Sequence, residues 1–222
     1  VEYSNLLAAF SGKRVLVRVL DLDFDKPLPF LREAGEGKYA NRGLQVLLAN
    51  PDVLEAQLNA LARAQAANPK TDLWVMAPMV LSVAEAQQFA KLARAAGLKK
   101  VGVMIEVPEV TEPGVIEGII EAVDFLSIGT NDLTHYALGK SRHVAGDGAV
   151  AGTITLAETR KPEVFNLIRR VILAAKAAGK PVGICGESAS DPESAKLFIE
   201  LGVDSLSASS ALLPQLKAAL LA

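Results

Sequence analysis

Carboxylates stand directly after two short apolar runs of this 222-residue chain. Glu106 ends the run VGVMIE, and Asp132 follows FLSIGT after Asn131. Two carboxylates in one cleft repel each other, and a hard divalent cation such as Mg²⁺ removes that repulsion. The alternative is that both side chains cap loops or pair with arginines at strand ends. The spacing alone leaves both interpretations open.

A guanidinium and a thiol occupy similar positions. Arg18 interrupts the run VLVRVL, and a guanidinium in a central strand needs a carboxylate or a phosphate as partner. An ion pair with Asp21 or Asp25 and an anionic ligand are both compatible with this position. Cys185 ends the run VGIC, either as a small buried hydrophobe or as a thiol that gives or takes a proton.

Short apolar runs that alternate with helix-length segments must position these side chains. Such alternation is typical of parallel strands joined by crossover helices. Helix N-termini are marked by an N-cap residue with Pro directly after it or Glu three residues later, as at Asn50–Pro51, Ser82 and Asp191–Pro192. The six predicted strands are 14–20, 73–79, 100–107, 124–128, 181–185 and 204–208. A seventh, very short strand is expected around Arg42–Gly43, and no convincing strand precedes residue 13.

The composition narrows the class of protein. Half of the residues are apolar, which suits a parallel sheet buried on both faces. The net charge of −2 gives no reason to expect a nucleic acid or an anionic membrane as partner. No apolar run approaches the roughly 18 residues of a membrane span, and the first residues do not resemble a signal peptide. The single cysteine excludes an internal disulfide. We expect one cytoplasmic domain over 1–222.

Several motifs resemble, in chain order, those of the phosphoenolpyruvate-utilising enzymes. The most specific is GTNDLTHY (129–136), in the form found in Enzyme I of the bacterial sugar phosphotransferase system. The other matching segments are VRVLDLDFDK (17–26), NRGLQ (41–45), APM (77–79), GVMIEVP (102–108), ICGESASD (184–191) and SLSASSALLP (205–214). The resemblance implies the phosphoenolpyruvate-binding domain, a TIM-type (β/α)₈ barrel, here lacking its first strand.

The resemblance also implies roles for individual residues. It makes Glu106 and Asp132 ligands of Mg²⁺, and it makes Cys185 the acid that protonates C3 of the enolate as pyruvate forms. The residues that it assigns to binding the phosphate and carboxylate of phosphoenolpyruvate are Arg18, Arg42, Asn131 and Arg142. Taken alone, Arg42 and Arg142 would be interpreted as solvated surface charges. The phosphoryl group passes to a histidine on a separate domain, in cis or in trans, and then to an HPr-like carrier. A homodimer is also implied.

Departures from the family pattern keep other functions open. Asp23–Phe24 replaces a Gly-Gly pair, Gln45 replaces an arginine, and Ser141 and Val144 alter the loop around Arg142. The segment TLAETRK (155–161) stands where the family has a Tyr-Gln-Pro string, and the Arg-bearing first strand is absent. One alternative is a catalytically inactive remnant that acts in dimerisation or regulation. Another is a different phosphoenolpyruvate or pyruvate enzyme, such as a dikinase, a phosphoenolpyruvate synthase or a pyruvate aldolase-like barrel.

Overall fold

A computed structural model describes residues 1–22, 28, 30–35, 37–139 and 156–221 of the chain. Its strands are β1 (Arg14–Arg18), β2 (Asp72–Ala77), β3 (Val101–Ile105), β4 (Phe125–Gly129), β5 (Val182–Cys185) and β6 (Ser205–Ser207). Their order in the sheet follows their order in the chain, and the pairs β1–β2, β2–β3, β4–β5 and β5–β6 are parallel. The α/β class and all six predicted strands are confirmed.

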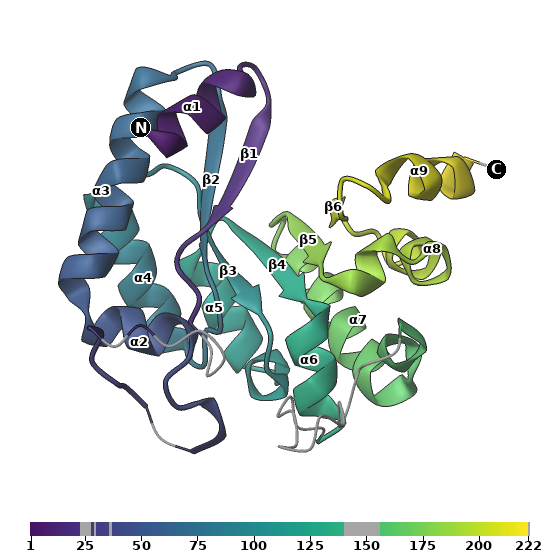
Figure 1. The fold of residues 1–222 in the computed structure, drawn as a ribbon. Helices are drawn as coiled ribbons and strands as arrows, with labels where there is room; N and C mark the ends of the chain where they lie inside the picture. The colour runs from purple at the N-terminus through teal and green to yellow at the C-terminus, as the bar shows by residue number, and fades with distance from the viewer. Residues whose placement is uncertain (23–27, 29, 36, 140–155, 222) are drawn as a thin grey trace, which may run out of the picture. The chain divides into compact units, whose positions relative to one another are not determined.

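Helices separate the strands along the chain (Figure 1). They are α1 (Glu2–Ala9), α2 (Gly43–Ala49), α3 (Pro51–Ala67), α4 (Val83–Ala95), α5 (Val115–Ala122), α6 (Thr130–Ala137), α7 (Pro162–Ala177), α8 (Pro192–Glu200) and α9 (Leu213–Leu221). Short 3₁₀ helices are η1 (Gly37–Tyr39), η2 (Pro108–Thr111), η3 (Leu156–Arg160) and η4 (Glu187–Ser190). Among the described residues, no strand precedes β1, in agreement with a barrel that lacks its first strand. No described helix has the length and apolar character that a bilayer span requires.

One prediction is wrong. The segment around Arg42–Gly43 forms no strand, because Arg42 is the extended N-cap residue of α2 and Gly43 is its first helical residue. The apolar side chains of Leu44, Val46 and Leu47 are buried at helical spacing. A short apolar run fits a buried strand and a buried helix equally well, and here tertiary packing selects the helix.

The chain divides into two compact units, and the first comprises Val1–Met104 with Glu121–Phe125. Its strand β1 is buried only at alternate residues, with Val15 and Val17 inside, whereas every residue of β3 is buried. Helices α1 and α3 pack together beside β1 and β2 (Figure 1). Gly102 leaves room for the Phe125 ring, which a Cβ at that glycine would approach to 2.5 Å. Trp74 lies against the same ring at 4.7 Å between centroids.

The second unit comprises Ile105–Ile120 with Leu126–Ala222. Its core includes Ile168 and Ile172 of α7, Phe198 of α8, and Val182 and Ile184 of β5, all essentially without solvent exposure. These residues recur at intervals of four in the helix and two in the strand, as faces turned toward a common core require.

Two aspartates, one in each unit, precede a strand and bind the start of the neighbouring strand. Asp124, before β4, accepts a hydrogen bond from the backbone N–H of Val101 at 2.9 Å. Asp204, before β6, accepts one from the N–H of Val182 at 2.8 Å. Both aspartates stand in the pattern Val-Asp-x-Leu-Ser, at 123–127 and 203–207. The pattern thus marks the amino end of a strand whose neighbour is held in register by a carboxylate.

The predicted helix signals are largely confirmed. Ser82 accepts a hydrogen bond from the backbone N–H of Glu85 at 3.2 Å, and the Glu85 carboxylate accepts one from the N–H of Leu81 at 2.7 Å. Asn50 precedes Pro51 as predicted, but its side chain makes no capping bond. It instead accepts a hydrogen bond from the N–H of Arg32 and donates to the carbonyl oxygens of Arg32 and Val46.

Replacing the capping hydroxyl tests this reading of α4. Ser82→Ala is expected to lower the free energy of unfolding by about 1 kcal/mol, because the N–H of Glu85 loses its acceptor. Urea denaturation followed by circular dichroism measures the change. Ser82→Asp, which restores an acceptor, serves as control and should unfold near the wild-type midpoint. Equal stability of the wild-type and alanine proteins would contradict the capping role.

Candidate functional site

The carboxyl ends of β4 and β5 form the centre of the candidate site in the second unit. Gly129 pairs with Cys185 in register, and Ser127 pairs with Gly183. Residues opposite each other in a parallel pair project to the same face of a sheet. Ser127, Gly129, Gly183 and Cys185 therefore share one face of the sheet. The two glycines leave space there for neighbouring side chains.

The Cys185 thiol lies between two groups of β4. The Ser127 hydroxyl donates a hydrogen bond to Sγ at 3.4 Å, and the thiol donates to the carbonyl oxygen of Ile128 at 3.5 Å. Cys185 is partly exposed, whereas Ser127 is buried. The interpretation of Cys185 as a small buried hydrophobe is therefore wrong, because the residue is partly exposed and its thiol contacts two polar groups.

The carboxyl group of Glu106 occupies the space beside Gly129. Glu106 follows β3 directly and is only 2 % exposed. A Cβ placed on Gly129 would lie 2.5 Å from Oε1 of Glu106 and 2.9 Å from its Cδ. Gly129 is also the N-cap residue of α6, at φ −88° and ψ 91°. A larger residue there is excluded by the carboxyl group rather than by backbone conformation.

Asp132 lies in the first turn of α6 and is 7 % exposed. A helix N-terminus favours negative charge because its first N–H groups point outward along the axis. The carboxyl group of Glu106 beside the N-cap residue, and that of Asp132 within the first turn, are therefore gathered at one helix end. Among the described residues, no group of three or more His, Cys, Asp or Glu side chains is placed to hold a metal ion. Two carboxylates are as many protein ligands as Mg²⁺ usually takes, with water and substrate oxygens as its other ligands.

Polar contacts join the first turn of α6 to the segment after β5. Thr130 donates a hydrogen bond to the carbonyl oxygen of Cys185 at 2.9 Å, and the Ser188 hydroxyl donates to Thr130 at 2.7 Å. The side-chain oxygen of Asn131 accepts a hydrogen bond from the N–H of Glu187 at 3.0 Å. Gly186 adopts φ 101°, and a Cβ there would lie 2.9 Å from the same Asn131 oxygen. With Oδ1 so engaged, the amide NH₂ of Asn131 is oriented away from Glu187.

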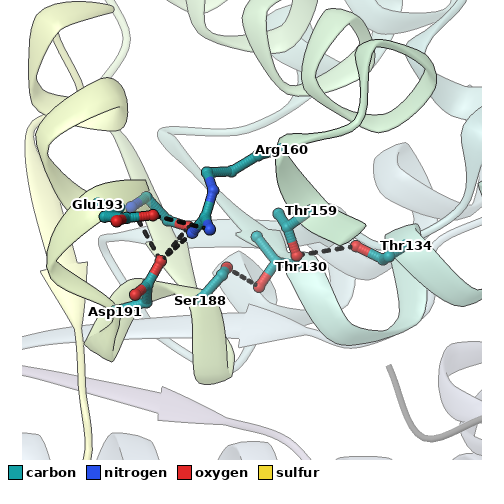
Figure 2. A network of polar contacts seen from close by, with 8 residues as sticks. Thr130, Thr134, Thr159, Arg160, Ser188, Asp191 and Glu193 are labelled. Atoms are coloured by element: carbon teal, nitrogen blue, oxygen red, sulfur yellow. Dashed lines mark hydrogen bonds and ion pairs between the residues drawn. The ribbon is translucent and has the colours of Figure 1, made fainter. Parts of the chain in front are cut away.

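A second layer of polar contacts supports these segments (Figure 2). Thr134 and Thr159 share a hydrogen bond at 3.3 Å, which ties α6 to η3. Arg160, also in η3, contacts the carboxylates of Asp191 at 2.5 Å and Glu193 at 2.9 Å. The segment TLAETRK, a departure from the family pattern, thus supplies both Thr159 and Arg160 to the support of the site.

Asp191 is the N-cap residue of α8 and a charged member of this network. Its carboxylate accepts hydrogen bonds from the backbone N–H and the hydroxyl of Ser194, at 3.0 Å and 2.6 Å. Burial by itself would raise the pKa of Asp191, but the bonds from Ser194 and the Arg160 guanidinium outweigh it and lower this pKa below its ordinary value. The folded state therefore favours the ionised carboxylate.

Two of the predicted arginines belong to the first unit. Arg18 pairs with Asp21, at 2.9 Å between Nη1 and Oδ2, and its side chain is 45 % exposed. One of the two local ion pairs expected from the sequence is thus present. Arg42 is only 4 % exposed, so its interpretation as a solvated surface charge is wrong. Gly43 follows it at φ 50°, and a Cβ there would collide with the side chain of Met79.

The structure gathers Glu106, Asn131, Asp132 and Cys185 around β4, β5 and α6 of one unit. The altered loop around Arg142, with Ser141 and Val144, lies outside the described residues, and so do Asp23 and Phe24. His135 is 8 % exposed, consistent with the structural role expected for an isolated histidine.

Comparison with known proteins decides the family. The model of the PEP-utilising enzymes, PEP-binding domain, matches residues 1–222. The chain belongs to this family. It is 44 % identical to the phosphoenolpyruvate-protein phosphotransferase of Streptomyces coelicolor over 98 % of this chain and 38 % of that protein. For the protein of the same name from Haloferax volcanii, the identity is 36 % over 98 % of this chain and 40 % of the relative.

Other comparisons agree with this membership of the PEP-utilising enzymes. A multiphosphoryl transfer protein of Rhodobacter capsulatus is 34 % identical over 93 % of this chain and 25 % of its own length. The chain thus spans about two fifths or less of these curated relatives. Among solved structures, an HpcH/HpaI aldolase from Desulfitobacterium hafniense matches with a TM-score of 0.52 at 15 % identity, over 98 % of this chain and 86 % of that one. At this identity the likeness concerns the fold alone.

The sequence does not single out several residues that shape the candidate site. Ser127 and Ser188 are ordinary serines by type, and Gly129 and Gly186 are identified as spaces only by the side chains that fill them. A usable signal exists for Thr130 and Gly129, because both stand inside the GTND motif between two predicted functional residues.

The low pKa of Asp191 predicts a pH-dependent contribution to stability. A depressed carboxylate pKa stabilises the fold above the ordinary value of 3.8, and this contribution is lost as pH falls through the lower folded-state value. Asp191→Asn, which keeps a capping oxygen, should therefore lower the unfolding free energy at pH 7, with a difference that shrinks below about pH 4. Urea titrations along a pH series measure this. Glu193→Gln, at a 76 % exposed partner of Arg160, is the control and should change little. A pH-independent difference for Asp191→Asn would contradict the assignment.

Proposed function

We propose that the chain is the phosphoenolpyruvate-binding domain of a phosphoenolpyruvate-protein phosphotransferase. In this proposal it binds phosphoenolpyruvate with Mg²⁺, and the phosphoryl group passes to a histidine on a separate domain, leaving pyruvate. The acceptor domain, the HPr-like carrier and the homodimer belong to the same proposal. The family match over 1–222 and the names of the curated relatives support it.

The observation that carries the proposal is the pair of buried carboxylates at the first turn of α6, beside the Cys185 thiol. Burying two carboxylates is costly unless cations or strong donors compensate them. Mg²⁺ would add a cation beside both carboxylates and would neutralise charge on the phosphate oxygens of the substrate. A purely structural role would not require a partly exposed cysteine in the neighbouring strand.

The protein's own groups then have distinct tasks. The NH₂ of Asn131 is oriented by the bond from Glu187 to Oδ1 and is a suitable donor to a phosphate oxygen. Arg18, Arg42 and Arg142 provide guanidinium groups for the phosphate and carboxylate. The thiol of Cys185 donates its proton to C3 of the enolate, and the sulfur keeps the electron pair of the broken S–H bond.

Binding of the substrate can be measured directly. Isothermal titration of phosphoenolpyruvate into the chain is expected to give saturable heat in the presence of Mg²⁺ and little heat in its absence, because the carboxylates need the cation to accept a phosphate beside them. Asp132→Asn should weaken this binding at least about tenfold, the loss of one charged ligand. Glu193→Gln, an exposed carboxylate, is the matched control. A folded chain that gives no heat at millimolar phosphoenolpyruvate with Mg²⁺ would sink the proposal.

The space at Gly129 offers a steric test of the same site. Gly129→Ala places a methyl group where the Glu106 carboxyl group lies, so Glu106 must move away from the N-terminus of α6. We expect Mg²⁺-dependent phosphoenolpyruvate binding to weaken by about tenfold or more, since misplacing one ligand costs on the order of 1.4 kcal/mol. Gly118→Ala, a helical glycine of α5 in the same unit, controls for the added methyl. Unchanged binding by Gly129→Ala would remove Glu106 from the site.

A further inference from the structure

The serine that donates a hydrogen bond to the thiol has no role in the proposed function so far. Ser127 is 4 % exposed and lies in β4, two residues before Gly129. Its hydroxyl donates to Sγ of Cys185 across the strand pair at 3.4 Å. Sulfur is a weak acceptor when it is a thiol and a strong one when it is a thiolate. The hydrogen bond from Ser127 is therefore strongest after the proton has left the sulfur of Cys185.

The surrounding glycines explain how the hydroxyl reaches the sulfur. Ser127 pairs in register with Gly183, which has no side chain to separate Ser127 from the strand β5. The hydroxyl group of Ser205 in β6 also lies beside Gly183, because a Cβ on that glycine would be 2.6 Å from the Ser205 Oγ. The face of the sheet immediately before Cys185 therefore carries hydroxyl groups from two strands and no bulky apolar side chain between them.

The backbone contact fixes the direction of the thiol proton. The S–H group points to the carbonyl oxygen of Ile128, while the Ser127 O–H group points to the sulfur. In the resting state the thiol is thus a donor on one side and an acceptor on the other. When the S–H bond breaks, the sulfur loses its donor role toward Ile128, and the bond from Ser127 is the one that strengthens.

We propose that Ser127 is a positioning residue for Cys185, which orients the thiol and stabilises the thiolate left by proton transfer. This inference rests on the proposed function for its chemical step. In that step the S–H bond breaks and its electron pair stays on sulfur, a C–H bond forms at C3 from the enolate π electrons, and the carbonyl group of pyruvate is restored. Solvent returns the proton to the thiolate afterwards. Ser127 touches the thiol and not the substrate.

The single cysteine of the chain makes the test specific, because every alkylation event reports on Cys185. The rate constant for reaction with iodoacetamide at one fixed pH near neutral is measured for the wild-type chain, Ser127→Ala and Ser127→Thr. The thiolate is the reactive form, so loss of a hydrogen bond to it should slow alkylation about tenfold in Ser127→Ala. Ser127→Thr keeps the hydroxyl and should recover most of the wild-type rate. Thr111→Val removes a buried hydroxyl of the same unit that donates to the carbonyl oxygen of Pro108 in η2, and it should leave the rate unchanged.

Three results would overturn the inference: equal rates for wild type and Ser127→Ala, no recovery in Ser127→Thr, or equal slowing in Thr111→Val. If Ser127→Ala does not fold, Ser127→Gly, which also removes the hydroxyl group, takes its place in the same alkylation assay. A wild-type rate in Ser127→Gly overturns the inference, and a rate about tenfold lower supports it. Alkylation needs no phosphoenolpyruvate. A failure of phosphoenolpyruvate binding would therefore remove the proposed function and leave the effect of Ser127 on the thiol standing.

Discussion

The packing of the Glu106 carboxyl group against Gly129 is the constraint on which the candidate site depends. A glycine at the end of β4 lets a carboxyl group from the end of β3 lie where a side chain would otherwise project. The same residue is the N-cap of α6, so the carboxyl group is placed beside the partial positive charge of a helix end. It is also the register partner of Cys185, so the thiol belongs to the same neighbourhood. One missing Cβ thus brings a carboxylate, a helix terminus and a thiol together.

Support for this arrangement comes from polar contacts between neighbouring segments of the second unit. Thr130, Asn131 and Ser188 join the start of α6 to the segment after β5. Behind them, Arg160 and Thr159 join η3 to α6 and α8. Buried polar networks of this kind restrict a site to one geometry when their members are satisfied. The family's usual string at this position is replaced here, yet the replacement contributes to the network rather than leaving a gap.

The sequence predicts the strands and the carboxylates well, because apolar runs and motif residues are local signals. It fails at Arg42–Gly43, where an apolar run too short to reveal its period proves helical. It also fails to single out Ser127, since a serine becomes informative only when the pairing of β4 with β5 brings its hydroxyl group to a thiol. The burial of Arg42 is another property of tertiary packing that the local sequence does not predict. Local patterns predict elements, whereas contacts between strands must be observed.

The aspartates before β4 and β6 align strands at the end of the sheet opposite to the candidate site. Asp124 and Asp204 fix the starts of neighbouring strands at the amino ends of the sheet, whereas the thiol and the carboxylates stand at the carboxyl ends. A parallel pair that is aligned from one end does not need its far loops to maintain alignment. Those loops are then free to change in length and composition over evolution. The described residues of the altered segment TLAETRK lie between α6 and α7, outside both aspartate-held strand starts, so substitutions there leave those starts aligned.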